Sequence, residues 1–455
     1  MQASIREIFE SIRSCKLSPV ELTKQCLERI EKLNPVLNAF ITVAAESSQV
    51  AARGAESEIQ RGNWRGPLHG IPIALKDMID TAGVATTAGS VLFRHRVPSA
   101  DAEVVRRLKQ AGAIVLGKQN LHELAYGGSS MISFFGEVRN PWNPAHIAGG
   151  SSGGSASAVA AGMCFAAIGT DTAGSIREPG ALCGIVGLKP TYGRVSTQGV
   201  IPLSPSLDHV GPLTRTVADA AIVLQAIAGP APGNGSAPDF SAALTKPVGK
   251  MRIGIPRKFF FEDLDPEVAA ATEQSISVLQ QLGGTIRELD LPVPTDRTLQ
   301  SAESYAVHAE NVARHPELYQ PETLRRIRTG EKITTEEVQR CRRELAEIRE
   351  SIQCVFEEVD VLLTPTTPIP APVIAELRQN PDLLRPREIL LLRNTRPVNV
   401  WGLPAISVPC GFTRAGLPIG FQIIGPAWGE ARVLQVAHAF EQATGWQQRQ
   451  PEIIT

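Results

Sequence analysis

The amino-acid sequence predicts an α/β protein in which helices cover a doubly wound sheet. Short runs of branched apolar residues alternate with amphipathic segments along the chain, which is typical of β-α-β units. The clearest unit places a strand at 251–255, a helix at 266–282 and a further strand at 285–289. With 455 residues, the chain is long enough for about two or three average domains or for one large α/β domain.

Composition and charge exclude several classes of function. Basic and acidic residues nearly balance at a net charge of −1, so no bulk electrostatic attraction toward nucleic acid or an anionic membrane is expected. The seven cysteines are scattered without a Cys-x-x-Cys pair, which argues for a reducing compartment and against disulfides or structural zinc. The sequence shows no basic-then-apolar leader and no apolar run near the ~18 residues of a membrane span. We therefore expect a soluble cytoplasmic protein.

Two helices come first along the chain. Ser18-Pro19-Val20-Glu21 is a capping-box pattern with proline at the first helical position, and apolar residues recur at helical spacing from Leu22 to Leu33. Asn34-Pro35 is expected to end this helix. An alanine-rich, charged helix at about 44–61 is expected to cover a sheet.

A strand with a lysine near its end follows at 70–77. Ile73 and Leu75 share one face of this strand, which places Lys76 on the other face. A lysine at a strand end is usually exposed, but the short apolar neighbours predict that Lys76 is buried, and burial disfavours the charged ammonium. A lysine that serves as a base near neutral pH must lose about three pKa units, roughly 4 kcal/mol. Alternation along the strand points Asp77 away from the amine.

The stretch from 149 to 194 carries the strongest functional pattern. After a helix and strand at 101–116, it opens with Gly149-Gly150-Ser151-Ser152-Gly153-Gly154-Ser155. A small-residue helix and a short apolar strand lead to a second turn, Asp171-Thr172-Ala173-Gly174-Ser175-Ile176-Arg177. A serine needs a base to become a nucleophile, and glycines let backbone N–H groups approach a reacting oxygen closely. The two turns therefore predict a catalytic site.

Three other interpretations fit this stretch less well. A glycine- and serine-rich run is often a flexible linker, but this one continues into 156–161, an alanine-rich segment that would pack closely. A phosphate-binding loop ends in Gly-Lys-Ser/Thr, and none follows. The Gly149-x-Ser151-x-Gly153 spacing matches a nucleophile elbow, which must follow an apolar strand. The proline-broken segment 140–144 precedes it instead and cannot be a central strand.

The second half of the chain continues the alternation of helices and strands. A helix at 217–227 leads into 229–236, the most loop-like segment of the chain. The charged, helical region 299–357 indicates a solvated layer rather than a lid over a pocket. Further strands are expected at 360–365, 404–409 and 419–424, the last two as a hairpin.

Five motifs together resemble the amidase signature family. They are the two turns quoted above, Gly70-Ile71-Pro72-Ile73-Ala74-Leu75-Lys76-Asp77, Gly187-Leu188-Lys189-Pro190-Thr191 and Gly402-Leu403-Pro404-Ala405-Ile406-Ser407-Val408-Pro409. The similarity covers nearly the whole chain. It implies the amidase signature fold, an α/β/α sandwich with a large mixed central sheet flanked by helices, as a single domain over 1–455. The catalytic core would span about 65–230, and a variable, substrate-shaping helical region about 295–395.

The resemblance also implies a Ser–cis-Ser–Lys triad. Ser175 takes the nucleophile position, Ser151 that of the bridging serine, whose preceding peptide is cis in the family, and Lys76 that of the base. A neutral lysine would accept a proton through the bridging hydroxyl as Ser175 attacks a carbonyl, and water would hydrolyse the resulting acyl-enzyme without a metal or organic cofactor. The family's oxyanion hole consists of backbone N–H groups, here those of Thr172, Ala173, Gly174 and Ser175.

The same resemblance assigns supporting and substrate-binding positions. Ser152, Asp171 and Arg177 are expected to support the triad. The substrate pocket is expected to draw on Ala125, Tyr126, Gly127, Gly128 and Ser129.

Two residues depart from the family's pattern. Ala173 stands where glycine is usual and is tolerable only with a negative φ. Glu178 is an unusual charge beside the nucleophile. We expect it to form a salt bridge with Arg177 or another basic group rather than to contact the substrate.

These expectations leave several functions to compare. We favour a free-standing hydrolase of a small-molecule amide, or of a carbamate (urethane) or anilide, without direct contact to nucleic acid or membrane; a homodimer stays open. The alternative is the glutaminase component of a tRNA-dependent amidotransferase, whose arginine for the glutamine carboxylate aligns here with Leu345, although Arg342 and Arg343 lie nearby. A biuret- or allophanate-type amidase that needs a small partner protein stays open as well. A binding protein on an inactive scaffold is disfavoured because all three triad positions are filled.

Overall fold

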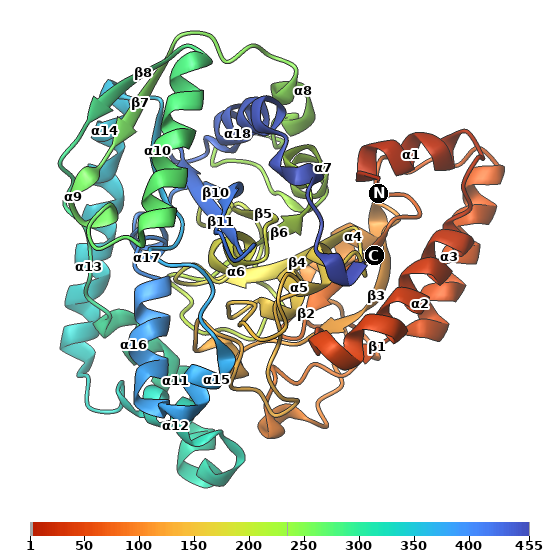
Figure 1. Cartoon of the computed structure of the whole chain (residues 1–455). Coiled ribbons are helices and arrows are strands. Elements are labelled where there is room, and N and C mark those ends of the chain that lie inside the picture. Colours follow the sequence, from red (N-terminus) through yellow and green to blue (C-terminus); the bar gives the residue numbers. More distant parts are fainter. Residues whose placement is uncertain (1–2, 234, 455) are drawn as a thin grey trace.

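The computed structural model describes residues 3–233 and 235–454, which form a mixed β-sheet flanked by helices (Figure 1). Within these residues the sheet has 11 strands in the order β1-β3-β2-β4-β6-β5-β10-β11-β9-β7-β8. The strands are β1 Phe40–Val43, β2 Pro72–Lys76, β3 Ile114–Gln119, β4 Ala166–Asp171, β5 Val186–Lys189, β6 His209–Thr214, β7 Met251–Ile255, β8 Gly284–Glu288, β9 Val361–Pro365, β10 Ala405–Phe412 and β11 Pro418–Ile424. Parallel pairs join β3, β2 and β4 toward one edge and β9, β7 and β8 toward the other, and antiparallel pairs connect them. The predicted large mixed sheet is confirmed.

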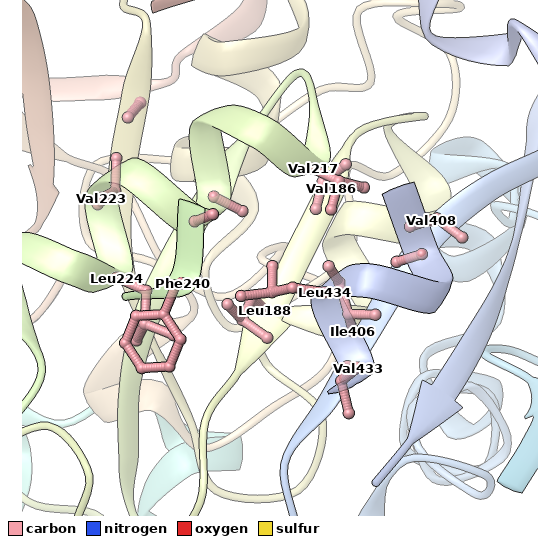
Figure 2. Close-up of a cluster of buried hydrophobic side chains, with 14 of the residues drawn as sticks. Val186, Leu188, Val217, Val223, Leu224, Phe240, Ile406, Val408, Val433 and Leu434 are labelled. Carbon is pink, nitrogen blue, oxygen red and sulfur yellow. The ribbon is translucent and has the colours of Figure 1, made fainter. Parts of the chain in front are cut away.

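The helices cover both faces of this sheet. They are α1 Ile5–Arg13, α2 Pro19–Leu37, α3 Ala45–Gln60, α4 Glu103–Gln110, α5 Gly153–Ala160, α6 Arg177–Leu182, α7 Val217–Ile227, α8 Phe240–Leu244, α9 Arg257–Phe260, α10 Pro266–Gln281, α11 Thr298–Arg314, α12 Pro321–Arg328, α13 Thr335–Ser351, α14 Val355–Glu358, α15 Ile374–Gln379, α16 Pro381–Leu391, α17 Arg396–Val400 and α18 Glu430–Thr444. Apolar side chains of α4, α7, α8, α10 and α18 form the largest core cluster with one face of the strands. In Figure 2, Leu224, Phe240 and Leu434 from the helices lie against Leu188 and Ile406 from the strands.

The opposite face carries the small-residue helix α5. Ala74 of β2 packs in a second core cluster with Ala156 of α5, whereas Ile73 and Leu75 belong to the first cluster. The predicted alternation along β2 is therefore confirmed. Because side chains alternate along a strand, Lys76 emerges on the face of α5, close to the first glycine- and serine-rich turn.

The helix α2 is longer than the sequence predicts. It begins at Pro19 as expected, but it passes through Pro35 and ends at Leu37, followed by Asn38 in the left-handed conformation with φ of +52°. A proline so close to the helix end removes only one backbone donor. Leu33 and Leu37 are both buried, and their packing outweighs that loss.

Figure 1 shows where the helices of the second half of the chain and the late hairpin lie relative to the sheet. The helices α11, α12 and α16, from the region predicted to shape the substrate pocket, lie together beside the sheet. The predicted late hairpin is confirmed, and its strands β10 and β11 lie in the middle of the sheet between β5 and β9.

Across residues 3–233 and 235–454, none of the helices combines the length and the apolar character needed to span a membrane.

Candidate active site

Lys76 lies at the end of β2 with an exposed fraction of 0%, which confirms its predicted burial. Its Nζ lies 2.7 Å from Ser151 Oγ and 2.7 Å from Thr170 Oγ1. Burial lowers the pKa of the Lys76 ammonium to about 7, against the opposing effect of the Asp171 and Asp208 carboxylates. Near neutral pH the uncharged amine is therefore well populated and can accept a proton.

The carboxylate next in sequence does not neutralise this lysine. Asp77 turns away as predicted: its Oδ1 lies 3.1 Å from Lys118 Nζ, and its Oδ2 accepts the N–H of Thr87 at 2.9 Å. Asp77 and Lys118 are both fully buried and compensate each other's charge. Within residues 3–233 and 235–454, Lys76 forms no salt bridge, so desolvation dominates its protonation equilibrium.

Ser151 is held through the backbone on both sides. The peptide bond between Gly150 and Ser151 is cis, as the resemblance implies. The N–H of Gly150 donates to Glu178 Oε2 at 2.7 Å, and the carbonyl of Ser151 accepts the N–H of His122 at 3.1 Å. A Cβ at position 150 would lie 2.8 Å from the backbone nitrogen of Ser130, so the close approach of these two segments requires glycine there.

The predicted salt bridge of Glu178 with Arg177 or another basic group is wrong, because Glu178 forms none within residues 3–233 and 235–454. Arg177 pairs with Asp171 at 3.0 Å, whereas Glu178 accepts the N–H of Gly150, the residue that precedes the cis bond. Successive residues of a helix diverge by about 100°, so their side chains reach different partners. Burial raises the pKa of Glu178 well above its usual range, because desolvation disfavours the charged carboxylate. Glu178 therefore places a hydrogen-bond acceptor beside the turn that holds Ser151.

The second turn is built around the carboxylate of Asp171. This carboxylate accepts the N–H of Gly174 at 2.8 Å, the N–H of Ile176 at 3.2 Å, and two guanidinium nitrogens of Arg177 at 3.0 Å each. Burial alone would raise the pKa of Asp171, but the Arg177 guanidinium outweighs this effect and holds the pKa below its usual range. The positive φ of this turn falls on Gly174, at +136°, and not on Ala173, so the condition for an alanine at 173 is met.

Ser175 lies between β4 and α6 and is 4% exposed. Its carbonyl accepts the N–H of Ser152 at 3.3 Å, and Ser152 Oγ donates to the carbonyl of Thr170 at 3.2 Å. The two glycine- and serine-rich turns are thus joined through Ser152. Because β2 and β4 are adjacent and parallel, their carboxyl ends lie side by side. Lys76, at the end of β2, and Ser175, which follows β4, therefore lie on the same side of the sheet.

One of the amides assigned to the oxyanion hole already has an acceptor inside the protein. The N–H of Gly174 donates to Asp171, as described above. Thr395 Oγ1 donates to the carbonyl of Ala173 at 2.7 Å, and Thr172 Oγ1 donates to the Asp208 carboxylate at 2.6 Å, so the turn is fixed from outside as well. A Cβ at position 174 would lie 2.0 Å from Thr395 Oγ1, which explains the glycine.

Sequence reasoning missed several residues that hold this site. Asn399 Nδ2 donates to Asp171 Oδ1 at 2.8 Å, and Gln422 Oε1 accepts from Arg177 Nη1 at 3.0 Å. Neither lies in a motif whose chemistry pointed to the triad. Thr170 could have been found, because it is the hydroxyl residue next to Asp171 at the end of a strand.

The loop predicted to bind the substrate packs its glycines against structural side chains. A Cβ at Gly127 would lie 2.2 Å from His122 Cε1 and 2.6 Å from Arg326 Nη1. A Cβ at Gly128 would lie 3.1 Å from Leu392 Cδ1. Both glycines therefore allow the loop to lie directly against α12 and the end of α16.

The other members of this loop have different surroundings. Ser129 Oγ donates to Glu388 at 2.6 Å, which anchors the loop to α16. Ala125 takes a positive φ of 58° and is buried. Tyr126 lines a cavity of about 230 Å³ next to α11 and α12. Of the five predicted residues, the structure thus places Tyr126 at a cavity.

Comparison with known proteins places this geometry in a family. The sequence profile of the amidase family matches residues 21–434. The chain belongs to the amidase signature family. This amidase is therefore a hydrolase that acts on C–N bonds.

Both free-standing amidases and amidotransferase subunits are among the relatives of this amidase. It is 41% identical over 480 residues to the A subunit of the glutamyl-tRNA(Gln) amidotransferase of Geobacter sp. (strain M21), with 97% of each chain covered. Its fold is similar to the peptide amidase of Stenotrophomonas maltophilia, with a TM-score of 0.85, 31% identity and coverage of 100% of this chain and 99% of the other. It is also similar to the A subunit of the glutamyl-tRNA(Gln) amidotransferase of Thermotoga maritima, with a TM-score of 0.78, 33% identity and coverage of 97% and 94%.

Proposed function

We propose that this amidase cleaves the C–N bond of small amides through an acyl-enzyme on Ser175, with Ser151 as the proton relay and Lys76 as the base. The observation that carries the proposal is the 2.7 Å contact between the fully buried Lys76 Nζ and Ser151 Oγ. An amine with a pKa of about 7 can take up a proton near neutral pH and release it again within one catalytic cycle.

The proton then follows the bonds that form and break. Ser175 Oγ attacks the carbonyl carbon while its proton passes to Ser151 and the proton of Ser151 passes to Lys76. When the C–N bond breaks, Lys76 returns a proton through Ser151 to the leaving nitrogen. Water repeats the same relay to hydrolyse the ester and release Ser175.

The carbonyl oxygen needs hydrogen-bond donors as it becomes negatively charged. We assign this role to the backbone N–H groups of Thr172, Ala173 and Ser175, because Asp171 already accepts from Gly174. Losing one such donor typically costs about 3–4 kcal/mol in the transition state. The turn that presents them is fixed by Asp171, Arg177 and Ser152, so little reorganisation is required during the reaction.

The surroundings of α13 favour a free-standing hydrolase over an amidotransferase component. Leu345, which aligns with the expected carboxylate-binding arginine, is buried in an apolar cluster with Leu207 and Leu299. Arg342 lies 3.2 Å from Glu303 and is therefore already paired. Carbamates and anilides join linear amides as the substrate classes to test.

The test uses the purified chain alone with a panel of amides, anilides, carbamates and glutamine. We expect turnover of amides without a partner, and an acyl adduct on the Ser175 peptide when a slowly hydrolysed substrate is quenched and analysed by mass spectrometry. Ser175→Ala abolishes turnover, whereas the exposed control Ser47→Ala retains it. Hydrolysis of glutamine that depends on an added amidotransferase partner, with no activity of the chain alone, would favour the amidotransferase function instead.

A further inference from the structure

A cavity beside Tyr126 is lined mainly by arginine side chains. It has a volume of about 230 Å³, and Arg297, Arg326, Arg385 and Gln300 contribute to its wall. These residues belong to α12, α16, the first turn of α11 and the residue that caps α11, and these three helices lie together in Figure 1. Segments that are distant in sequence thus bring several cations to one small space.

Positive charge exceeds negative charge around this cavity. Glu388 lies 2.8 Å from Arg326 and 3.7 Å from Arg385, so two guanidinium groups share its single charge. Glu322 adds a contact of 2.9 Å to Arg326. Among residues 3–233 and 235–454, the guanidinium of Arg297 forms neither an ion pair nor a hydrogen bond. The cavity therefore has at least one cation without a counter-charge.

Buried polar atoms around the cavity also lack partners in the described part of the chain. They are Arg326 Nη2, Gln300 Oε1, and Nε and Nη1 of Arg396, which lies close enough to influence Arg297. Arg326 is 2% exposed, and Arg396 is 4% exposed. A buried polar group without a hydrogen-bond partner destabilises the fold. A bound anion would accept from the guanidinium nitrogens of Arg326 and Arg396 and relieve the repulsion between these cations.

Electrostatics support the same interpretation. Burial and the neighbouring Arg396 and Arg385 lower the pKa of Arg297 to about 9. Burial and Arg326 likewise lower the pKa of Arg385. Like charges are thus held together in a poorly solvated space, which is favourable only when an anion joins them.

The cavity lies close to the reactive serines. Tyr126 is three residues from Ser129, a span of at most about 11 Å of chain. A Cβ built on Gly150 would lie 2.9 Å from the backbone nitrogen of Ser129, so Ser129 lies against the residue that precedes Ser151. From the other side, Arg396 directly follows Thr395, whose hydroxyl binds the carbonyl of Ala173 at 2.7 Å.

We propose that this cavity binds a carboxylate of the substrate, so that the preferred substrates are amides that carry a carboxylate a few methylene groups from the scissile carbonyl. Arg297 and Arg385 bind the carboxylate, because a planar guanidinium matches its two oxygens. Tyr126 lines the cavity at the start of the segment whose Ser129 lies close to Gly150. The inference rests on the proposed function and names the substrate class for it.

The first test compares two amides of equal length, glutaramate, the monoamide of glutaric acid, and the neutral pentanamide. Wild-type protein is expected to prefer glutaramate in kcat/KM by about tenfold or more, mainly through KM. Arg297→Gln lowers the ratio of the two kcat/KM values by about tenfold. Arg328→Gln, an exposed arginine on α12, is the matched control and leaves the ratio within about twofold. A ratio that Arg297→Gln leaves unchanged overturns the proposal.

The second test measures binding without turnover. Isothermal titration of glutarate into Ser175→Ala is expected to show one site, which is lost when Arg297→Gln or Arg385→Gln is added and is kept with Arg328→Gln. Glutarate binding with no amide hydrolysis by the wild type would contradict the proposed function and support the anion site. Amide hydrolysis without glutarate binding would support the proposed function and contradict the anion site. Retained thermal unfolding transitions in both variants separate a lost site from a lost fold.

Discussion

Lys76 connects the chemistry of the site to pH through a single amine. Its pKa falls from 10.5 to about 7 because burial removes the ammonium from water. We predict that log kcat/KM rises with pH and levels off above an apparent pKa near 7, since only the uncharged amine accepts a proton. A pH-rate profile with a small amide measures this, and a profile that stays flat from pH 8 to pH 5 contradicts it.

The same amine has a consequence for stability. The folded protein holds Lys76 with a depressed pKa, so its contribution to stability is present above pH 10.5 and is lost as pH falls toward 7. We predict that the free energy of unfolding of wild type, relative to Lys76→Met, decreases as pH falls through this window, by at most about 1.4 kcal/mol per pH unit. Denaturant titrations of both proteins between pH 7 and pH 10 measure the difference. A constant difference would show that the amine is solvated.

Glu178 gives a second prediction for a single residue. Because burial disfavours the charged form of its carboxyl, which accepts from Gly150 N–H, Glu178→Gln keeps an acceptor of the same shape and is expected to retain most activity. Glu178→Ala leaves that amide without a partner and is expected to cost about 1–3 kcal/mol in stability and to lower kcat. Thermal unfolding and steady-state kinetics of the two variants check this. Equal losses in both would indicate that a charge at position 178 is required.

At the scale of elements, α1 is attached to α7 through one buried carboxylate. Asp219 Oδ1 accepts the N–H of Ile5 at 2.9 Å, and burial raises the pKa of Asp219 from 3.8 to about 7. A raised carboxyl pKa contributes stability that is present below pH 3.8 and is lost as pH rises through 7. We predict that Asp219→Asn, which keeps the acceptor, loses less stability than wild type between pH 4 and pH 7. Urea titrations across that range measure this, and parallel curves contradict it.

Elements with a strong local pattern could be predicted from the sequence. The alternation along β2 and the hairpin of β10 and β11 follow from the spacing of apolar residues, which is a local property. The end of α2 could not be predicted, because the packing of Leu37 overrides the proline signal.

The residues of the site also fall into those that sequence motifs identify and those that only the fold brings together. Lys76, Ser151 and Ser175 stand in motifs, so their sequence neighbours identify them. Thr395 and Asn399 hold the second turn from positions 222 and 228 residues further along the chain, and only the folded sheet brings them there. The partner of Glu178 was mispredicted because helix geometry, rather than charge, decides which way a buried side chain turns.

At the scale of the whole molecule, the sheet has a protected middle and two weaker edges. Strand β10 pairs on both sides, whereas β1 and β8 are the outermost strands of the described sheet. We predict that amide hydrogens of β10 and β11 exchange only with global unfolding, and that those of β1 and β8 exchange faster through local opening. Hydrogen exchange followed by mass spectrometry resolves these segments. Equal protection of edge and middle would show that the sheet opens as one unit.

The central position of the β10–β11 hairpin also bears on how the protein is made. On the ribosome, strands β2, β4, β5 and β6 are made early. The hairpin of β10 and β11 connects β5 to β9 in the sheet, so this connection cannot form until residues up to 424 have been synthesised. At typical translation rates the nascent chain waits about 10–40 s between the completion of β6 and that of β11. Throughout this interval Arg177 lacks its contact with Gln422, so one of the bonds that hold the second turn forms only after the hairpin has been made.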